Sequence, residues 1–187
     1  MWLSLGHDFH HTTDTRYIFK NGLGVIDVAE IIEEHFHSSE VWFGSTGGVA
    51  PGSQNSLTPY RVTSAAVANT FGTPILVLDG SETPVRAGMK YFDPHRLQIV
   101  NVQNNAKTYR LRVASNRLGH TSWADAVAAG VYTDVCFKID TTNRDASPFY
   151  MQTPRQNAHA IVWAAVATLD AVAQWVDILF GIHEYEE

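Results

Sequence analysis

The sequence contains a single cysteine, Cys136, among its 187 residues, so no disulfide can form within the chain. Cys136 lies in the strand-like run 133–137, where we expect it to be a small buried apolar residue. A chain of this length buries roughly two thirds of its unfolded surface and needs no covalent cross-link to fold. We therefore expect one domain over residues 1–187.

Charged residues are also scarce, at 17% of the chain, and the formal net charge is -6. A negative balance argues against direct binding to nucleic acid. The basic residues gather in residues 86–117, whereas the chain after Arg155 carries acids and no Lys or Arg. The acidic terminal segments can pair electrostatically with the basic central segment, either within one chain or between copies of the chain.

The sequence has no long uninterrupted apolar run. The most apolar stretch, residues 158–182, is broken by Asp170, Gln174 and Asp177, and a charge in the middle of a membrane is costly. We read this stretch as core, not as a membrane span. The first residues also lack the basic and apolar segments of a signal peptide, so we do not expect export.

Strand patterns are abundant. They occur at 58–63, 74–78, 97–102, 108–113 and 131–139. In 108–113 the alternation turns Tyr109, Leu111 and Val113 inward and Arg110 and Arg112 outward. Asn104 and Asn105 form a turn before this strand, which predicts a hairpin between 97–102 and 108–113.

The stretch from 160 to 182 has two interpretations. Residues 160–167 contain good helix formers, whereas Val172, Gln174, Val176 and Ile178 follow a period of two. We favour two strands, 160–169 and 171–182, that turn near Asp170.

Two short helices are indicated by capping boxes. Asp27 and Glu30 open a segment that runs to about His35, and Ser122 and Asp125 open one that ends at Gly130. We also expect an extended N-terminal segment of about residues 1–24 and a Gly/Ser-rich loop at 44–56. Nine or ten strands with few helices predict an all-β fold, a jelly-roll-like antiparallel β-sandwich.

Histidines are numerous, and His35 and His37 place two imidazoles on one face of a strand. With Glu40 they resemble the first cupin motif, although cupins have one more residue before the glutamate. His95 is a possible remote fourth ligand. The alternative is histidines hydrogen-bonded in a polar seam, and we assign no metal ligand and no cofactor.

No nucleophile elbow, phosphate-binding loop or dinucleotide-binding motif is present in the sequence, so we expect no enzyme and name no catalytic residue. Aromatic residues near turns have three possible roles: they line a carbohydrate groove, form a subunit contact or pack in the core. They are Trp42, Phe43, Tyr60, Tyr91, Phe92, Trp123, Phe149 and Tyr150. The outward-facing Arg110 and Arg112 have two interpretations. They bind acidic groups of a neighbouring molecule, or they lie on a solvated strand face.

Several short segments of the sequence resemble segments of uncharacterised structural proteins of tailed bacteriophages, of the head or decoration type. They are residues 35–44, 56–60, 83–85, 91–96 and 181–186. The resemblance implies a virion protein made in the host cytoplasm, a capsid or capsid-decoration component that forms a homo-oligomer and contacts other virion proteins. One alternative is a carbohydrate- or receptor-binding β-sandwich module. A second is a cupin-like metal-binding protein.

Overall fold

The computed structural model describes residues 19–21, 24–26, 41–45, 52–54, 56–83, 86–139 and 149–186. The chain divides into two compact units, residues 1–36 and residues 37–187. The described part of the first unit is an antiparallel pair of strands, β1 (Phe19–Asn21) and β2 (Gly24–Ile26). The helix predicted from Asp27 to about His35 lies outside the described residues.

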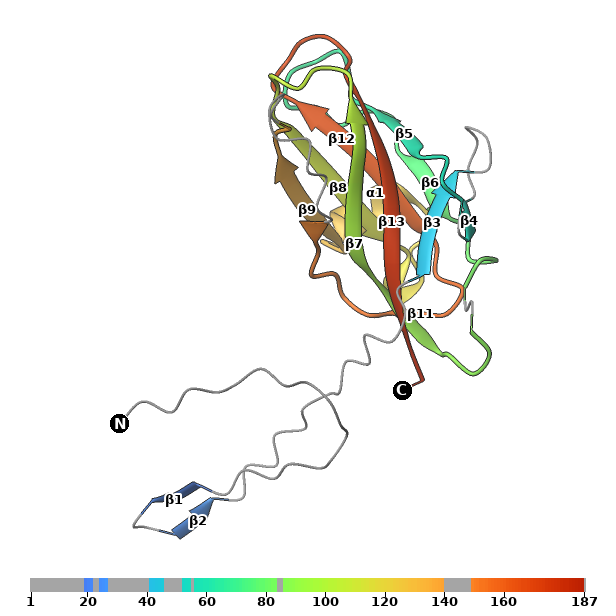
Figure 1. The fold of residues 1–187 in the computed structure, drawn as a ribbon, viewed down its shortest axis with the longest axis vertical. Coiled ribbons are helices and arrows are strands. Elements are labelled where there is room, and N and C mark those ends of the chain that lie inside the picture. Colours follow the sequence, from blue (N-terminus) through green and yellow to red (C-terminus); the bar gives the residue numbers. More distant parts are fainter. Residues whose placement is uncertain are drawn as a thin grey trace. The chain divides into compact units, whose positions relative to one another are not determined.

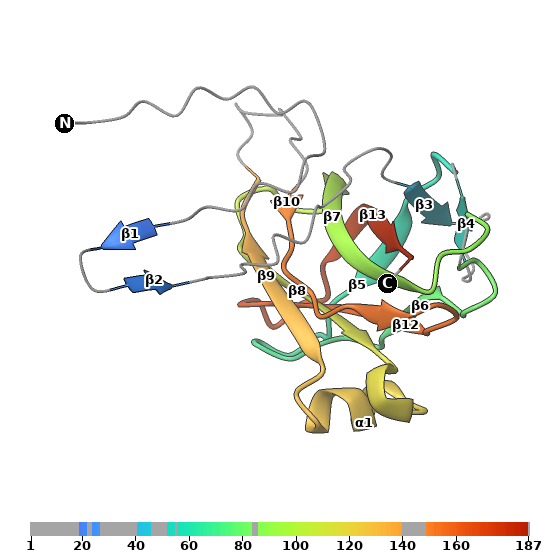
Figure 2. The same ribbon diagram turned by 90° about the horizontal axis from the view of Figure 1, so that it is seen from below.

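The described strands of residues 37–187 form two antiparallel sheets that pack as a sandwich (Figures 1 and 2). The larger, seven-stranded sheet contains β3 (Val41–Ser45), β4 (Gly52–Gln54), β5 (Tyr60–Thr63), β7 (Tyr91–Val102), β10 (Phe149–Tyr150), β11 (Gln156–Asn157) and β13 (Trp175–Tyr185). The four-stranded sheet has the order β6 (Ile75–Leu78), β12 (Val162–Thr168), β8 (Tyr109–Ser115), β9 (Tyr132–Phe137). The predicted antiparallel β-sandwich is therefore confirmed.

The long central strands β7 and β13 organise the seven-stranded sheet. They pair along most of their length, β3 and β5 add to β13, and β10 and β11 add to β7. Alternate side chains of both sheets fill the core, and Tyr109, Leu111 and Val113 are buried there as their pattern predicts.

The predicted hairpin between residues 97–102 and 108–113 is wrong. The first segment belongs to β7 in the larger sheet, and the second belongs to β8 in the smaller one. The turn exists, because the Lys107 amide donates to the Asn104 carbonyl at 3.2 Å, but it carries the chain from one sheet to the other. Both strands present an apolar face. Those faces are buried equally well when the strands lie in two facing sheets as when they pair in one sheet.

The two strands predicted on either side of Asp170 are confirmed as β12 and β13. They also lie in different sheets. The second predicted helix is confirmed as α1 (Trp123–Ala128), whose first turn is capped by the Ser122 hydroxyl accepting from the Asp125 amide. Gly130 follows with a φ of 74°, as a left-handed C-terminal cap requires.

Cys136 is exposed, so the expectation of a buried cysteine is wrong. Val135 and Phe137 face the core from β9, and because a strand alternates, Cys136 between them faces outward. The Gly/Ser-rich loop at 44–56 contains β4, and the rest of it lies largely outside the described residues. Among the residues that the structure describes, no helix has the length and apolarity needed to span a membrane.

Candidate functional site

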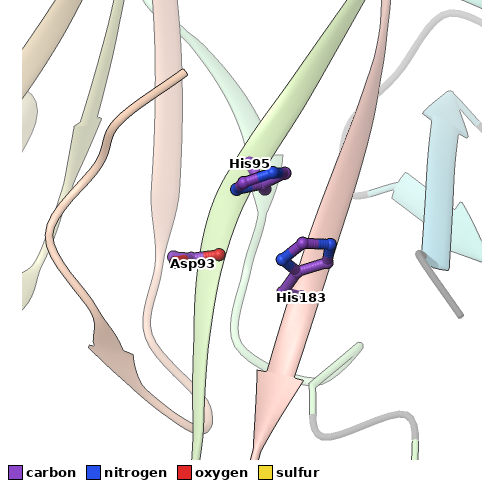
Figure 3. Close-up of side chains that lie close together, drawn as sticks. All are labelled: Asp93, His95 and His183. Carbon is purple, nitrogen blue, oxygen red and sulfur yellow. The ribbon is translucent and has the colours of Figure 1, made fainter. Parts of the chain in front are cut away.

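Among the described residues, Asp93, His95 and His183 form a cluster of potential metal ligands, which we call the β7–β13 cluster (Figure 3). One ligand atom from each side chain lies within 4.8 Å of the others. Asp93 and His95 come from β7, and His183 comes from the neighbouring β13. The cluster thus joins residues about ninety positions apart in the sequence.

Strand register places two of these side chains opposite one another. His183 pairs with Asp93, and Ile182 pairs with Pro94. Gly181 then pairs with Arg96, which leaves His95 as the extra residue of a β-bulge. Pro94 has no amide hydrogen to donate to a ladder, and proline inside a sheet occurs at bulges for this reason. Because a strand alternates, His95 lies on the same face as Asp93, and the bulge places Arg96, the next residue, opposite Gly181.

The bulge is held by the segment after β10. The Met151 amide donates to the His95 carbonyl at 2.7 Å, and the Thr153 hydroxyl donates to the Pro94 carbonyl at 2.8 Å. The segment after β10 therefore fixes the backbone at His95 from the side of β7 that lies away from β13.

The two imidazoles of the cluster are stacked. The ring centroids of His95 and His183 are 3.9 Å apart, and the planes differ by 24°. Tyr150 meets the His95 ring edge to face, with centroids 5.6 Å apart. His183 is buried, whereas Asp93 and His95 are half-buried, so the cluster has one side toward solvent.

Tyrosine and arginine side chains surround the carboxylate. The Tyr185 hydroxyl donates to Asp93 Oδ2 at 2.9 Å and so fixes the orientation of the carboxylate. The Arg155 guanidinium carbon lies 4.2 Å from the Tyr185 ring centroid, and that of Arg96 lies 4.7 Å from the Tyr150 ring centroid. The site therefore combines one anionic ligand and two imidazoles with cationic groups stacked on its aromatic neighbours.

Two imidazoles and one carboxylate are the ligand types preferred by zinc and related divalent transition metals. The sequence identified one of the three, His95, as a remote partner of His35 and His37. Those two histidines and Glu40 lie outside the described residues. Sequence reasoning missed Asp93 and His183 as a pair, because no motif or spacing connects them and only the pairing of β7 with β13 brings them together.

The outer face of the seven-stranded sheet continues beyond the cluster. A Cβ placed on Gly181 would lie 3.2 Å from Arg96 Cβ and 3.4 Å from Trp42 Cε2, so the glycine makes room for these two side chains. Tyr150 beside them is 67% exposed. Of the aromatic residues that the sequence offered as a binding surface, Phe43, Tyr60 and Phe92 are instead buried in the core. The outer face retains Trp42 and Tyr150.

The outward arginines of β8 have a partner within the chain. Arg112 Nε and Nη2 donate to the two carboxylate oxygens of Asp134 on β9, at 2.7 and 2.8 Å. The Arg112 guanidinium also stacks on Tyr132, 3.6 Å from the ring centroid. The sequence analysis suggested an acidic group of a neighbouring molecule as one partner for Arg112. In the structure, Asp134 of the same sheet is its partner.

A different surface carries exposed apolar side chains on two loops. Val67, Leu169 and Val172 are 59%, 67% and 63% exposed. The first loop contacts the end of β12, directly before the second loop, because the Asn69 amide donates to the Thr168 carbonyl at 2.7 Å. We call these three side chains the loop-end apolar cluster.

Comparison with known proteins gives no relative: no family model matches the chain, and no match is found among curated proteins or solved structures.

Proposed function

We propose that this chain is a structural protein of a tailed-phage virion, a capsid or capsid-decoration component that acts by self-assembly or by binding to a lattice. The observation that supports this function most directly is the loop-end apolar cluster of Val67, Leu169 and Val172. Exposed apolar side chains on neighbouring segments are typical of protein–protein contact sites.

A second exposed apolar site lies elsewhere on the sandwich. Phe149 and Tyr150 of β10 are exposed, and they pair with Leu97 and Arg96 in the body of β7. Two apolar sites at different positions suit a building block that contacts different neighbours through different surfaces. Such contacts generate rings, sheets or shells.

The first compact unit adds to this argument. Its described strands, β1 and β2, have three residues each, and a two-stranded sheet of that size is marginal in water by itself. This pair of strands therefore needs a further surface to be stable. In an assembly, a neighbouring subunit supplies that surface. The assignment to a phage in particular is based on the resemblance of the short sequence segments described above.

The test is light scattering after size exclusion of the full chain, with negative-stain imaging of the same peak. We expect a discrete oligomer, sheets or shells. The double variant Leu169→Asp/Val172→Asp introduces two charges into the loop-end apolar cluster and is expected to dissociate the assembly. Ala87→Asp introduces a charge at an exposed position away from that cluster and is expected to assemble normally.

A monomer at every concentration contradicts self-assembly. Lattice binding is then tested by co-sedimentation of the chain with purified phage shells. Failure of both, or equal assembly of wild type and the double variant, contradicts the proposed contact surface.

A second candidate function, carbohydrate or receptor binding, is favoured by the outer face of the seven-stranded sheet. Exposed Tyr150, with Arg96 stacked on it and Trp42 near Gly181, offers an aromatic surface to a sugar ring. A glycan array probed with wild type and with Tyr150→Ala tests it. Binding that disappears in the variant supports this function, and an array without signal argues against it.

A further inference from the structure

We propose that Asp93, His95 and His183 bind one divalent transition-metal ion, of the Zn²⁺ and Co²⁺ class, which ties β7 to β13 at the bulge. The inference is independent of the proposed virion function, because it depends only on the geometry of the β7–β13 cluster (Figure 3). Three protein ligands leave one tetrahedral position, which water fills from the half-exposed side.

The distances fit this assignment after a small adjustment. Tetrahedral zinc with bonds of about 2.0–2.2 Å to nitrogen and oxygen holds its ligand atoms roughly 3.3 Å apart. In the structure the three ligand atoms lie within 4.8 Å of one another. Side-chain rotation closes this gap without movement of the strands, because Asp93 and His183 already pair directly across the ladder.

The imidazoles must also change their relative orientation. Stacked rings, with planes 24° apart, direct their nitrogens nearly parallel, whereas one metal ion needs them to converge. His95 is the less buried of the two imidazoles and its backbone is held by the Met151 amide, so we expect the His95 side chain to be the one that turns. Binding is therefore expected to separate the stacked rings, which gives a spectroscopic signature.

The surroundings of the cluster both support and oppose a cation. The Tyr185 hydroxyl, 2.9 Å from Asp93 Oδ2, orients the carboxylate as outer-sphere groups commonly do in metal sites. Arg96 and Arg155 place positive charge nearby, stacked on Tyr150 and Tyr185. Their repulsion lowers the affinity, so we expect a site weaker than a four-ligand structural zinc site.

The experiment uses the full chain without a histidine tag, stripped of metal by a chelator. Zn²⁺ is titrated by calorimetry, and Co²⁺ is followed by its visible absorption. We expect one ion per chain and a higher melting temperature with metal. In NMR spectra of the imidazoles, the signals of His95 and His183 should shift on Zn²⁺ addition.

The variants His95→Ala and Asp93→Asn are expected to weaken Zn²⁺ binding by at least about tenfold. Both positions are half-buried, so neither substitution opens the core. The matched control is His35→Ala/His37→Ala, which removes the other histidine pair and is expected to bind Zn²⁺ like wild type.

Three results overturn the proposal: absence of stoichiometric binding, equal binding by wild type and both site variants, or loss of binding in the control. Absence of binding leaves the stacked histidines as a metal-free polar seam between β7 and β13. Loss in the control places the metal at His35 and His37.

Discussion

The Tyr60 hydroxyl of β5 donates a hydrogen bond of 2.9 Å to the Val77 carbonyl of β6 and so links the two sheets of the sandwich. Val77 is the extra residue where β6 pairs irregularly with β12, since Leu78 opposes Val162 and Leu76 opposes Trp163. A bulge leaves its extra residue outside the ladder. The hydroxyl supplies a buried carbonyl with the partner that the ladder does not.

The first prediction concerns this bond. Tyr60→Phe keeps the ring in the core but removes the donor, and we expect a loss of about 1–2 kcal/mol in the free energy of unfolding. Urea denaturation measures it. Tyr132→Phe, which removes a hydroxyl from a half-buried ring on β9, is the control and should leave stability nearly unchanged. Equal stability of Tyr60→Phe and wild type would show that the sheet-to-sheet bond contributes nothing.

The same residue makes stability depend on alkaline pH. Burial, with a smaller contribution from the Glu82 carboxylate, raises the pKa of Tyr60 above its ordinary value of 10.0. The unfolded chain therefore loses the phenolic proton first, so stability is complete below about pH 10 and falls as the pH rises further. Urea titrations across this range should show a shallower fall in Tyr60→Phe. A residual fall is expected because burial also raises the pKa of Tyr109. Identical slopes contradict the assignment to Tyr60.

Glu82 is a source of instability at neutral pH. Its Oε2 accepts from the Asp79 amide at 2.9 Å, but Oε1 is buried without a hydrogen-bond partner in the described part of the chain. Burial raises the pKa of Glu82, so the folded chain binds this proton more tightly than the unfolded chain. The stabilisation is complete below the ordinary pKa and is lost as the pH rises through the raised one.

We therefore expect Glu82→Gln to equal or exceed wild type in stability at pH 7, by no more than about 1 kcal/mol. The difference should shrink near pH 4, where the wild-type carboxyl is protonated. Thermal unfolding at both pH values measures it. Asp79→Asn is the contrasting control, since a hydrogen bond with Ser81 lowers the pKa of Asp79 and its loss should destabilise at pH 7. Marked destabilisation by Glu82→Gln at pH 7 contradicts the prediction.

Arg112 and Arg110 are predicted to differ although both face outward from β8. Arg112 makes a two-bond pair with Asp134 and its side chain is 13% exposed, whereas Arg110 approaches Asp134 only to 4.0 Å and is 42% exposed. Lysine cannot reproduce the planar two-bond pair or the stacking on Tyr132. We expect Arg112→Lys to cost about 1 kcal/mol and Arg110→Lys almost nothing in urea denaturation. Similar costs for both variants contradict this distinction.

Gly72 is predicted to tolerate no side chain. A Cβ at this position would overlap the Thr63 carbonyl oxygen, which is backbone and cannot turn away. Gly88 has a φ of 92° with nothing within 4 Å of a Cβ. Gly72→Ala should cost at least about 3 kcal/mol because the chain must shift, whereas Gly88→Ala should cost about 1 kcal/mol of backbone strain. Melting temperatures that rank the two variants in the opposite order contradict the prediction.

The sequence alone predicted the fold class and most elements. Alternation in residues 108–113, the capping box at Ser122, and the turn at Asp170 depend on contacts within a few residues, so local patterns predict them. Cys136 shows the limit of that reasoning. An apolar run predicts a strand, but which of its residues face the core depends on how the strand is placed in its sheet.

Only the tertiary structure decided which sheet each strand joins. The pattern of 97–102 and 108–113 is the same for a hairpin and for two strands packed face to face, because both arrangements bury the same side chains. The β7–β13 cluster required the same information. His95 carries a local signal, but Asp93 and His183 are neighbours only because two strands distant in sequence pair in one register, with a bulge at Pro94 and His95. Pairing between distant strands is set by the packing of the whole sandwich, which no local pattern encodes.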